Sequence, residues 1–220
     1  MLGGPRNVPA LAANLELPNF PMMIQQFLHD QHHDHADPLE FDPGTAPAFM
    51  GRVSTFSSAS ASFYAPSDLS GTGGMRREYI RATPTWRGGP ARNDCIFVNM
   101  DSDHHDDGMM DGLTIARVLC FFSFRNRTSY FRCAVVHWFS YILDGRDPDT
   151  GMYIVAPSMD DDGTPDVSII HIDSIFRAAH LIPVYGTNFL PREITAHHSY
   201  DVFRAYYVNK YADHHAFEIA

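Results

Sequence analysis

The sequence predicts a mainly β protein of the α+β class, built around a small antiparallel barrel of about six strands with helical segments before and after it. Two observations lead to this prediction. Short runs of β-branched and aromatic residues recur at intervals of roughly ten residues from Cys95 onward, and turn-forming residues separate them. Apolar residues make up 45% of the 220 residues, which suffices for one sizeable core.

The clearest elements are two long apolar runs, 114–124 and 130–141, which the polar segment 125–129 joins as a hairpin. Pro183 lacks a backbone N–H, so the strand that contains it is expected at a sheet edge. By its pattern, we expect the barrel to be SH3-like or BAH-like. The shorter predicted strands are 96–98, 152–156, 167–172 and 180–185.

The barrel domain is assigned to residues 52–220, and residues 1–51 are predicted to form an N-terminal extension. Residues 1–17 show no periodicity, whereas apolar residues at helical spacing predict one short helix between Leu17 and His29. A linker rich in His, Asp and Pro follows. Within the domain, residues 75–80 are expected to form a short helix, and a helical, His-rich tail is expected from Tyr200.

The charges are unevenly distributed. Sixteen basic and 26 acidic residues give a net charge of −10, which argues against a protein that coats nucleic acid by charge alone. Five arginines nevertheless lie between Arg76 and Arg92, beside Tyr79 and Trp86, with Glu78 as the one acid of this segment. Guanidinium groups bind phosphates in a bidentate manner, and aromatic rings stack on bases.

These observations predict a nucleic-acid or partner-binding site, whose candidate residues are Arg76, Arg77, Arg81, Trp86, Arg87, Arg92, Arg125 and Arg127. In the alternative interpretation, Tyr79 and Trp86 pack against the barrel while the arginines pair with acidic loops.

Thirteen histidines raise the question of a metal site. Neighbouring side chains point apart in strands and helices, so adjacent histidines make poor ligand pairs. The run 32–35 and the pair 104–105 lie in polar segments, and 103–108 departs from a calcium-binding loop at two ligand positions. Asp213, His214 and His215 are the weak metal candidates that remain, and no metal or other cofactor is expected.

No catalytic motif is present: the sequence contains no nucleophile elbow, no phosphate-binding loop and no dinucleotide-binding glycine motif. Its apolar runs are too short for a membrane helix and its start lacks a signal-peptide core, so we expect no membrane partner and a nuclear or cytoplasmic, non-secreted protein. Cys95, Cys120 and Cys133 form no Cys-x-x-Cys pair, which indicates reduced thiols.

Several long motifs are distinctive, among them Phe63-Tyr64-Ala65-Pro66 and Arg177-Ala178-Ala179-His180-Leu181. Together with 73–81, 116–124 and 203–218, they resemble the C-terminal region of Plavaka-type transposon proteins of basidiomycete fungi, which are related to the KDZ (Kyakuja-Dileera-Zisupton) transposases. The resemblance extends over the chain from about Leu17. It implies that the RNase H-like catalytic core lies upstream of this region, so no catalytic residue is carried over and no enzyme is expected here.

The expected function is therefore that of a non-catalytic C-terminal accessory module, or a fragment, of a transposase-derived protein, which binds a protein or chromatin partner. Direct DNA binding through the arginines of 76–92 is the first alternative. A metalloprotein or metal-dependent enzyme that uses Asp213, His214 and His215 is the second.

Overall fold

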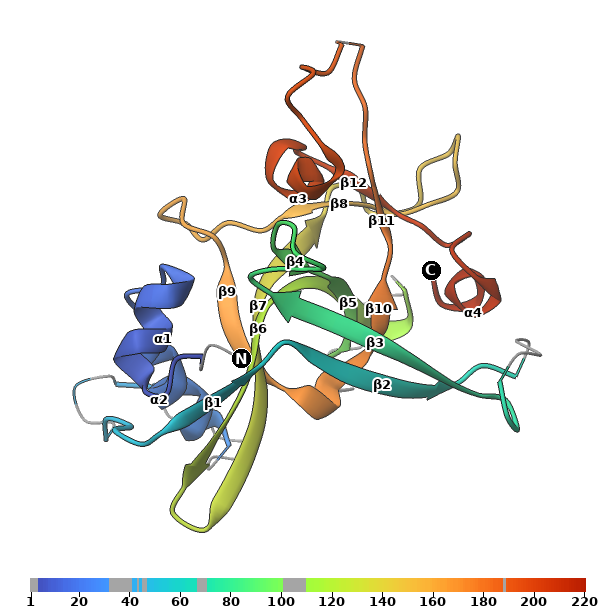
Figure 1. Ribbon diagram of the computed structural model, residues 1–220. Helices are drawn as coiled ribbons and strands as arrows, with labels where there is room; N and C mark the ends of the chain where they lie inside the picture. Colours follow the sequence, from blue (N-terminus) through green and yellow to red (C-terminus); the bar gives the residue numbers. More distant parts are fainter. Residues whose placement is uncertain are drawn as a thin grey trace.

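The computed structural model describes residues 4–31, 41–42, 44, 47–66, 71–100, 110–187 and 189–220. Over these residues the protein is mainly β and antiparallel, as predicted, and a nine-stranded sheet forms its centre (Figure 1). The strands of this sheet are β1 (Val53–Phe56), β5 (Cys95–Asn99), β6 (Leu113–Asn126), β7 (Ser129–Tyr141), β8 (Ile154–Pro157), β9 (Val167–His171), β10 (Ile175–Ala179), β11 (Leu181–Pro183) and β12 (Tyr206–Val208).

The central sheet curls into a nearly closed barrel. Its strand order is β10-β5-β6-β7-β8-β12-β11, with β1 paired to β6 and β9 paired to β7. The two ends of this order, β10 and β11, are separated in the chain only by His180, which brings the ends of the sheet together. Buried side chains fill the interior, including Phe97, Ile115, Phe139, Val155 and Tyr206.

The hairpin of β6 and β7 confirms the strongest sequence prediction, and β11 confirms the expected edge at Pro183 because it pairs only with β12. A bulge between Val118 and Cys120 reverses the order in which successive side chains of β6 point to the two faces of the sheet. Ile115 therefore faces the barrel interior before the bulge, and Phe122 lies on the same face of the sheet after it. At the hairpin end, elements outside the barrel bury this face of the sheet.

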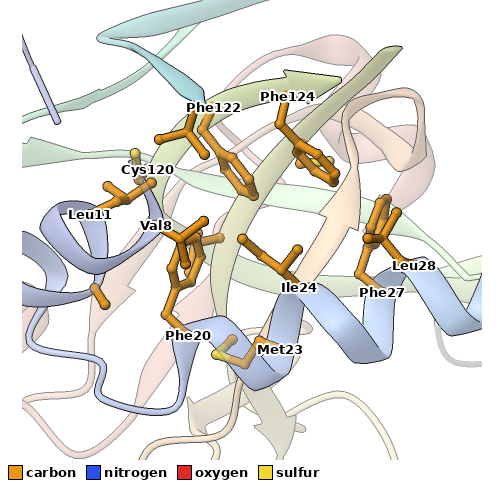
Figure 2. Close-up of a cluster of buried hydrophobic side chains, with 14 residues drawn as sticks. Val8, Leu11, Phe20, Met23, Ile24, Phe27, Leu28, Cys120, Phe122 and Phe124 are labelled. Atoms are coloured by element: carbon orange, nitrogen blue, oxygen red, sulfur yellow. The ribbon is translucent and has the colours of Figure 1, made fainter. Parts of the chain in front are cut away.

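Two helices cover this face, α1 (Val8–Leu15) and α2 (Phe20–Asp30). Helix α2 confirms the helix predicted between Leu17 and His29. The irregular start predicted for residues 1–17 was wrong, because Asn7 caps α1 by accepting a hydrogen bond from the Ala10 N–H at 2.9 Å. Figure 2 shows both helices turning their apolar side chains toward Cys120, Phe122 and Phe124 of β6. The N-terminal segment is thus part of the core, and most of the predicted linker at 31–47 lies outside the described residues.

A second sheet of three strands, β2 (Ser58–Tyr64), β3 (Met75–Thr83) and β4 (Arg92–Asn93), covers the opposite face of the central sheet. The helix predicted at 75–80 was wrong. Ile80 and Ala82 alternate with Tyr79 and Arg81 at the two-residue period of a strand. Pairing with β2 stabilises this segment as a strand. The inner side chains of this sheet pack on Ile96, Val98, Ala116, Val118 and Phe121.

The C-terminal part contains α3 (Ser199–Val202), β12 and α4 (His214–Ile219), so the predicted helical tail is interrupted by a strand. Short 3-10 helices lie at η1 (Met110–Gly112), η2 (Ile172–Ser174) and η3 (Ala196–His198). Counting both sheets, the described residues form more strands than the roughly six expected. No helix in the described part of the chain is long and apolar enough to span a membrane.

Candidate nucleic-acid interface

The outer side of the three-stranded sheet and the turn that follows β3 carry five of the eight residues that were predicted to bind nucleic acid or a partner. In the register of β2 and β3, Arg81 lies opposite Ser58, Tyr79 opposite Ser60 and Arg77 opposite Ser62. Because side chains alternate along a strand, these six share one face, whereas Ala59, Ala61 and Ile80 point inward to the core. The ring of Tyr79 is 58% exposed on this face.

The turn between β3 and β4 extends the same surface. Arg87 and Gly88 both have positive φ, 52° and 76°, and the Trp86 N–H donates to the carbonyl of Pro90 at 3.0 Å. This tight turn holds the Trp86 ring among three guanidinium groups, those of Arg81, Arg87 and Arg92, at 4.3, 5.4 and 5.3 Å from its centroid. We call the serines Ser58, Ser60 and Ser62 together with Arg77, Tyr79, Arg81, Trp86, Arg87 and Arg92 the basic face.

The charges of the basic face are mostly uncompensated. Arg92 forms an ion pair with Asp94 at 2.7 Å. Arg77 instead contacts the hydroxyl of Ser62 at 3.4 Å, and Arg81 donates to the carbonyl of Tyr79 at 3.4 Å. Among the residues that the structure describes, neither of these two arginines nor Arg87 pairs with a carboxylate. Of the four arginines of the basic face, Arg92 is therefore the one that pairs with a carboxylate within the described residues.

Arg76 belongs to the inner side of β3, because it pairs in register with the buried Phe63. Arg125 and Arg127 lie at the exposed tip of the β6–β7 hairpin, which Figure 1 shows at the lower edge of the molecule, away from the β3–β4 turn. The structure thus brings Arg77, Arg81, Arg87 and Arg92 together with Trp86, and leaves the other three predicted arginines outside this surface.

An ionic cluster behind the basic face ties β3 to the rest of the molecule. Arg177 of β10 is 4% exposed and makes a bidentate pair with Asp213, with nitrogen–oxygen distances of 2.9 and 2.6 Å. Its guanidinium also lies 3.5 Å from Glu78 of β3 and 3.0 Å from the Nδ1 of His215. Glu78 accepts a further hydrogen bond from the backbone N–H of Ala178. Strands β3 and β10 and helix α4 therefore meet at one buried cation.

The pKa values follow from this arrangement. Hydrogen bonds from Arg177 are the main cause that lowers the pKa of Asp213 to about 2, with help from the Ala216 N–H that it caps. Burial raises the pKa of Glu78 because desolvation outweighs its Ala178 hydrogen bond and the attraction of Arg177. Burial and the neighbouring Arg177 lower the pKa of His215, which favours its neutral form.

Two of the three weak metal candidates, Asp213 and His215, belong to this cluster. The Asp213 carboxylate and His215 face a guanidinium cation, while His214 is exposed on α4, so the two histidines diverge as expected. Within the described ranges, no group of three or more His, Cys, Asp or Glu side chains is placed to hold a metal ion. The histidines at 32–35 and 104–105 and the loop 103–108 lie outside these ranges.

One further feature bears on chemistry. Cys95, Cys120 and Cys133 are buried, and burial raises the pKa of each thiol to about 12, so none of them is an activated nucleophile.

The serines of the basic face were not predicted as part of the site, although the alternation of Ser and Ala from 58 to 62 has the two-residue period of a strand.

Comparison of the chain with protein-family models, with curated proteins and with solved structures finds no match. The resemblance to Plavaka-type transposon proteins therefore stays a prediction, as does the SH3-like or BAH-like kind of barrel.

Proposed function

We propose that the protein is a non-catalytic binding module whose basic face binds a single-stranded nucleic acid. One observation carries the proposal. Arg77, Tyr79 and Arg81 share an exposed sheet face with three serine hydroxyls, and the Trp86 turn continues this face without a carboxylate partner for Arg77, Arg81 or Arg87 among the described residues.

The spacing suits an extended strand of nucleic acid. Alternate residues of a β-strand lie roughly 6.8 Å apart, so the Cα atoms of Arg77 and Arg81 lie roughly 14 Å apart with Tyr79 midway between them. Two phosphates can then contact the guanidinium groups while a base stacks on the ring. A sheet face with exposed rings fits unpaired bases, whereas reading duplex DNA requires an element that enters a groove.

The net charge of −10 bears on the strength of binding. Acidic residues elsewhere in the chain repel a polyanion, so we expect affinity to depend on the local contacts of the basic face and to weaken steeply with salt. The resemblance to a transposon protein supports nucleic acid as the ligand. We place the module in the nucleus or cytoplasm, where three free thiols stay reduced.

The test is the anisotropy of a labelled single-stranded oligonucleotide of about fifteen nucleotides, with DNA, RNA and duplex forms compared. Replacing Arg77 and Arg87 by Gln together should weaken binding and flatten the slope of log affinity against log salt by about 1.4, because each lost phosphate contact removes about 0.7. The matched control replaces the exposed Arg192 and Arg204 by Gln, which removes the same charge elsewhere. Equal losses in the two double variants, or a preference for duplex, would contradict the proposal.

A protein partner is the second candidate, and the free edge of β2 favours it, because an exposed backbone edge can accept a strand from another chain.

A further inference from the structure

The edge of β2 is open. This strand lies at the end of the order β2-β3-β4, and among the described strands it pairs only with β3. The Ala82 N–H donates to the Ser57 carbonyl, and the Ala65 N–H donates to the Gly74 carbonyl. Because every second residue of an antiparallel strand bonds to its neighbour, these two bonds determine which residues of β2 bond to β3. Ala59, Ala61 and Phe63 consequently bond to β3. The backbone N–H and C=O groups of Ser58, Ser60 and Ser62 point away from β3, and no strand in the described part of the chain pairs with them.

A groove of about 660 Å³ runs along this open edge. β2 forms one wall with side chains no larger than serine and alanine from 58 to 62, so another backbone can approach closely. The opposite wall comes from the β6–β7 hairpin and from η2 and the residue after it. It combines the apolar Phe121, Ile172 and Ile175 with the polar Tyr130, Arg132 and Asp173.

The wall carries one carboxylate and one guanidinium group. The Asp173 carboxylate lies 3.2 Å from the Nδ1 of His171, but this nitrogen accepts the backbone N–H of Asp173, so the carboxylate stays exposed and is not neutralised there. Arg132 is exposed and stacks over the Tyr130 ring at 5.8 Å, but within the described ranges no carboxylate pairs with it. The groove therefore offers a cation to an incoming chain, beside an apolar wall and a row of unpaired backbone groups.

We infer that β2 accepts an extended segment of a partner protein as an added strand. The backbone of the segment bonds to Ser58, Ser60 and Ser62, apolar side chains at alternate positions contact Phe121, Ile172 and Ile175, and an acidic side chain pairs with Arg132. The groove and the basic face share Ser58, Ser60 and Ser62. The added strand bonds to the backbone of these serines, whereas the basic face presents their hydroxyls beside the arginines, so the inference does not depend on nucleic-acid binding.

Selection from a phage library of random peptides of about nine residues, a length that spans the seven residues of β2, provides the test. We expect enriched peptides to alternate apolar residues and to carry Asp or Glu. A synthetic copy of one enriched peptide should slow hydrogen exchange at the amides of Ser58, Ser60 and Ser62 at least tenfold.

Two substitutions at one position separate backbone pairing from other contacts. Ser60→Pro removes an outward N–H on an edge strand, where proline is tolerated, and should weaken the peptide at least tenfold. Ser60→Ala keeps the N–H and should bind as the unmodified protein does. Ser62→Pro repeats the test should Ser60→Pro lose the circular dichroism of the fold. Arg132→Gln should weaken acidic peptides about fivefold or more and leave their neutral analogues unchanged.

The inference is overturned if no peptide is enriched, if both Ser60 variants bind equally, or if the β2 amides stay unprotected. A dimer in sedimentation that Ser60→Pro abolishes would assign the edge to a second copy instead. Protection of the same amides by an oligonucleotide would assign it to nucleic acid. Because the Arg77/Arg87 double variant should retain peptide binding, failure of this inference and failure of the proposed function are distinguishable.

Discussion

The most informative single substitution is Asp213→Asn, because Asp213 has two roles that this change separates. Its side chain caps α4 by accepting from the Ala216 N–H at 2.7 Å, and it pairs with the buried Arg177. Asparagine keeps an oxygen for the cap but loses the charge. A pKa lowered from 3.8 to about 2 corresponds to at most roughly 2 kcal/mol of stability. Because the Ala216 cap, which Asn keeps, causes part of this shift and the side chain is 32% exposed, we expect a loss of about 1–2 kcal/mol in the free energy of unfolding at pH 7.

Urea unfolding at several pH values measures this loss in the free energy of unfolding and shows how it changes with pH. The folded pKa of Asp213 lies below its unfolded value of 3.8, so its contribution is present above pH 4 and is lost as the pH falls toward 2. The difference in stability between the unmodified protein and Asp213→Asn should therefore shrink to near zero across this window. The raised pKa of Glu78 acts in the opposite direction, and because the Asp213 charge is one of the causes that raise it, this opposing contribution is smaller in Asp213→Asn.

Asp201→Asn is the matched control, because Asp201 also pairs with an arginine, Arg117 at 2.6 Å, but its side chain is 58% exposed. An exposed pair contributes less than about 1 kcal/mol. A loss below about 0.5 kcal/mol for Asp213→Asn, or a loss that stays constant from pH 7 to pH 2, would refute the role given to the buried cluster.

Three further predictions concern the core, the turn and the thiols. Phe20→Ala should cost about 3–5 kcal/mol in urea unfolding, because the Phe20 ring is fully buried against Phe122 with centroids 5.5 Å apart; a loss below about 1 kcal/mol would show that α2 does not stabilise the sheet. Gly88→Ala should cost about 1 kcal/mol and weaken oligonucleotide binding, since φ is +76° there and nothing lies near an added Cβ; unchanged stability would contradict this reading of the turn. The three cysteines should react with a thiol reagent only after unfolding, and rapid labelling of the native protein would contradict their burial.

The sequence predicts the barrel strands best where apolar runs are long and polar residues clearly separate them. The runs that became β6 and β7 are long and apolar, and the polar residues between them leave little choice but a hairpin. Helix α1 was missed because eight residues give too little periodicity, and its stability comes from packing Leu11 against the sheet. Strand β3 was mistaken for a helix because charged residues occupy both of its faces, which hides the alternation of apolar and polar residues typical of a strand. Its pairing with β2 reveals the strand.

The candidate site was predicted in part for a similar reason. Arg81, Arg87 and Arg92 are near Trp86 in the sequence, and a local turn suffices to bring them together. The role of Asp213 was not predictable, because its partner Arg177 lies 36 residues away and is brought close only by the barrel. Sequence spacing alone suggested a metal ligand there, and a guanidinium group takes that place.

The most direct test of the basic face uses Trp86 as its own reporter. The chain has two tryptophans, and Trp138→Phe leaves Trp86 as the only one. Because Trp86 lies among the arginines that we propose to bind phosphates, adding a single-stranded oligonucleotide should change its fluorescence in step with the anisotropy signal, and salt should reverse both. Oligonucleotide binding that leaves the Trp86 emission unchanged, or no binding at low salt, would contradict the proposed function.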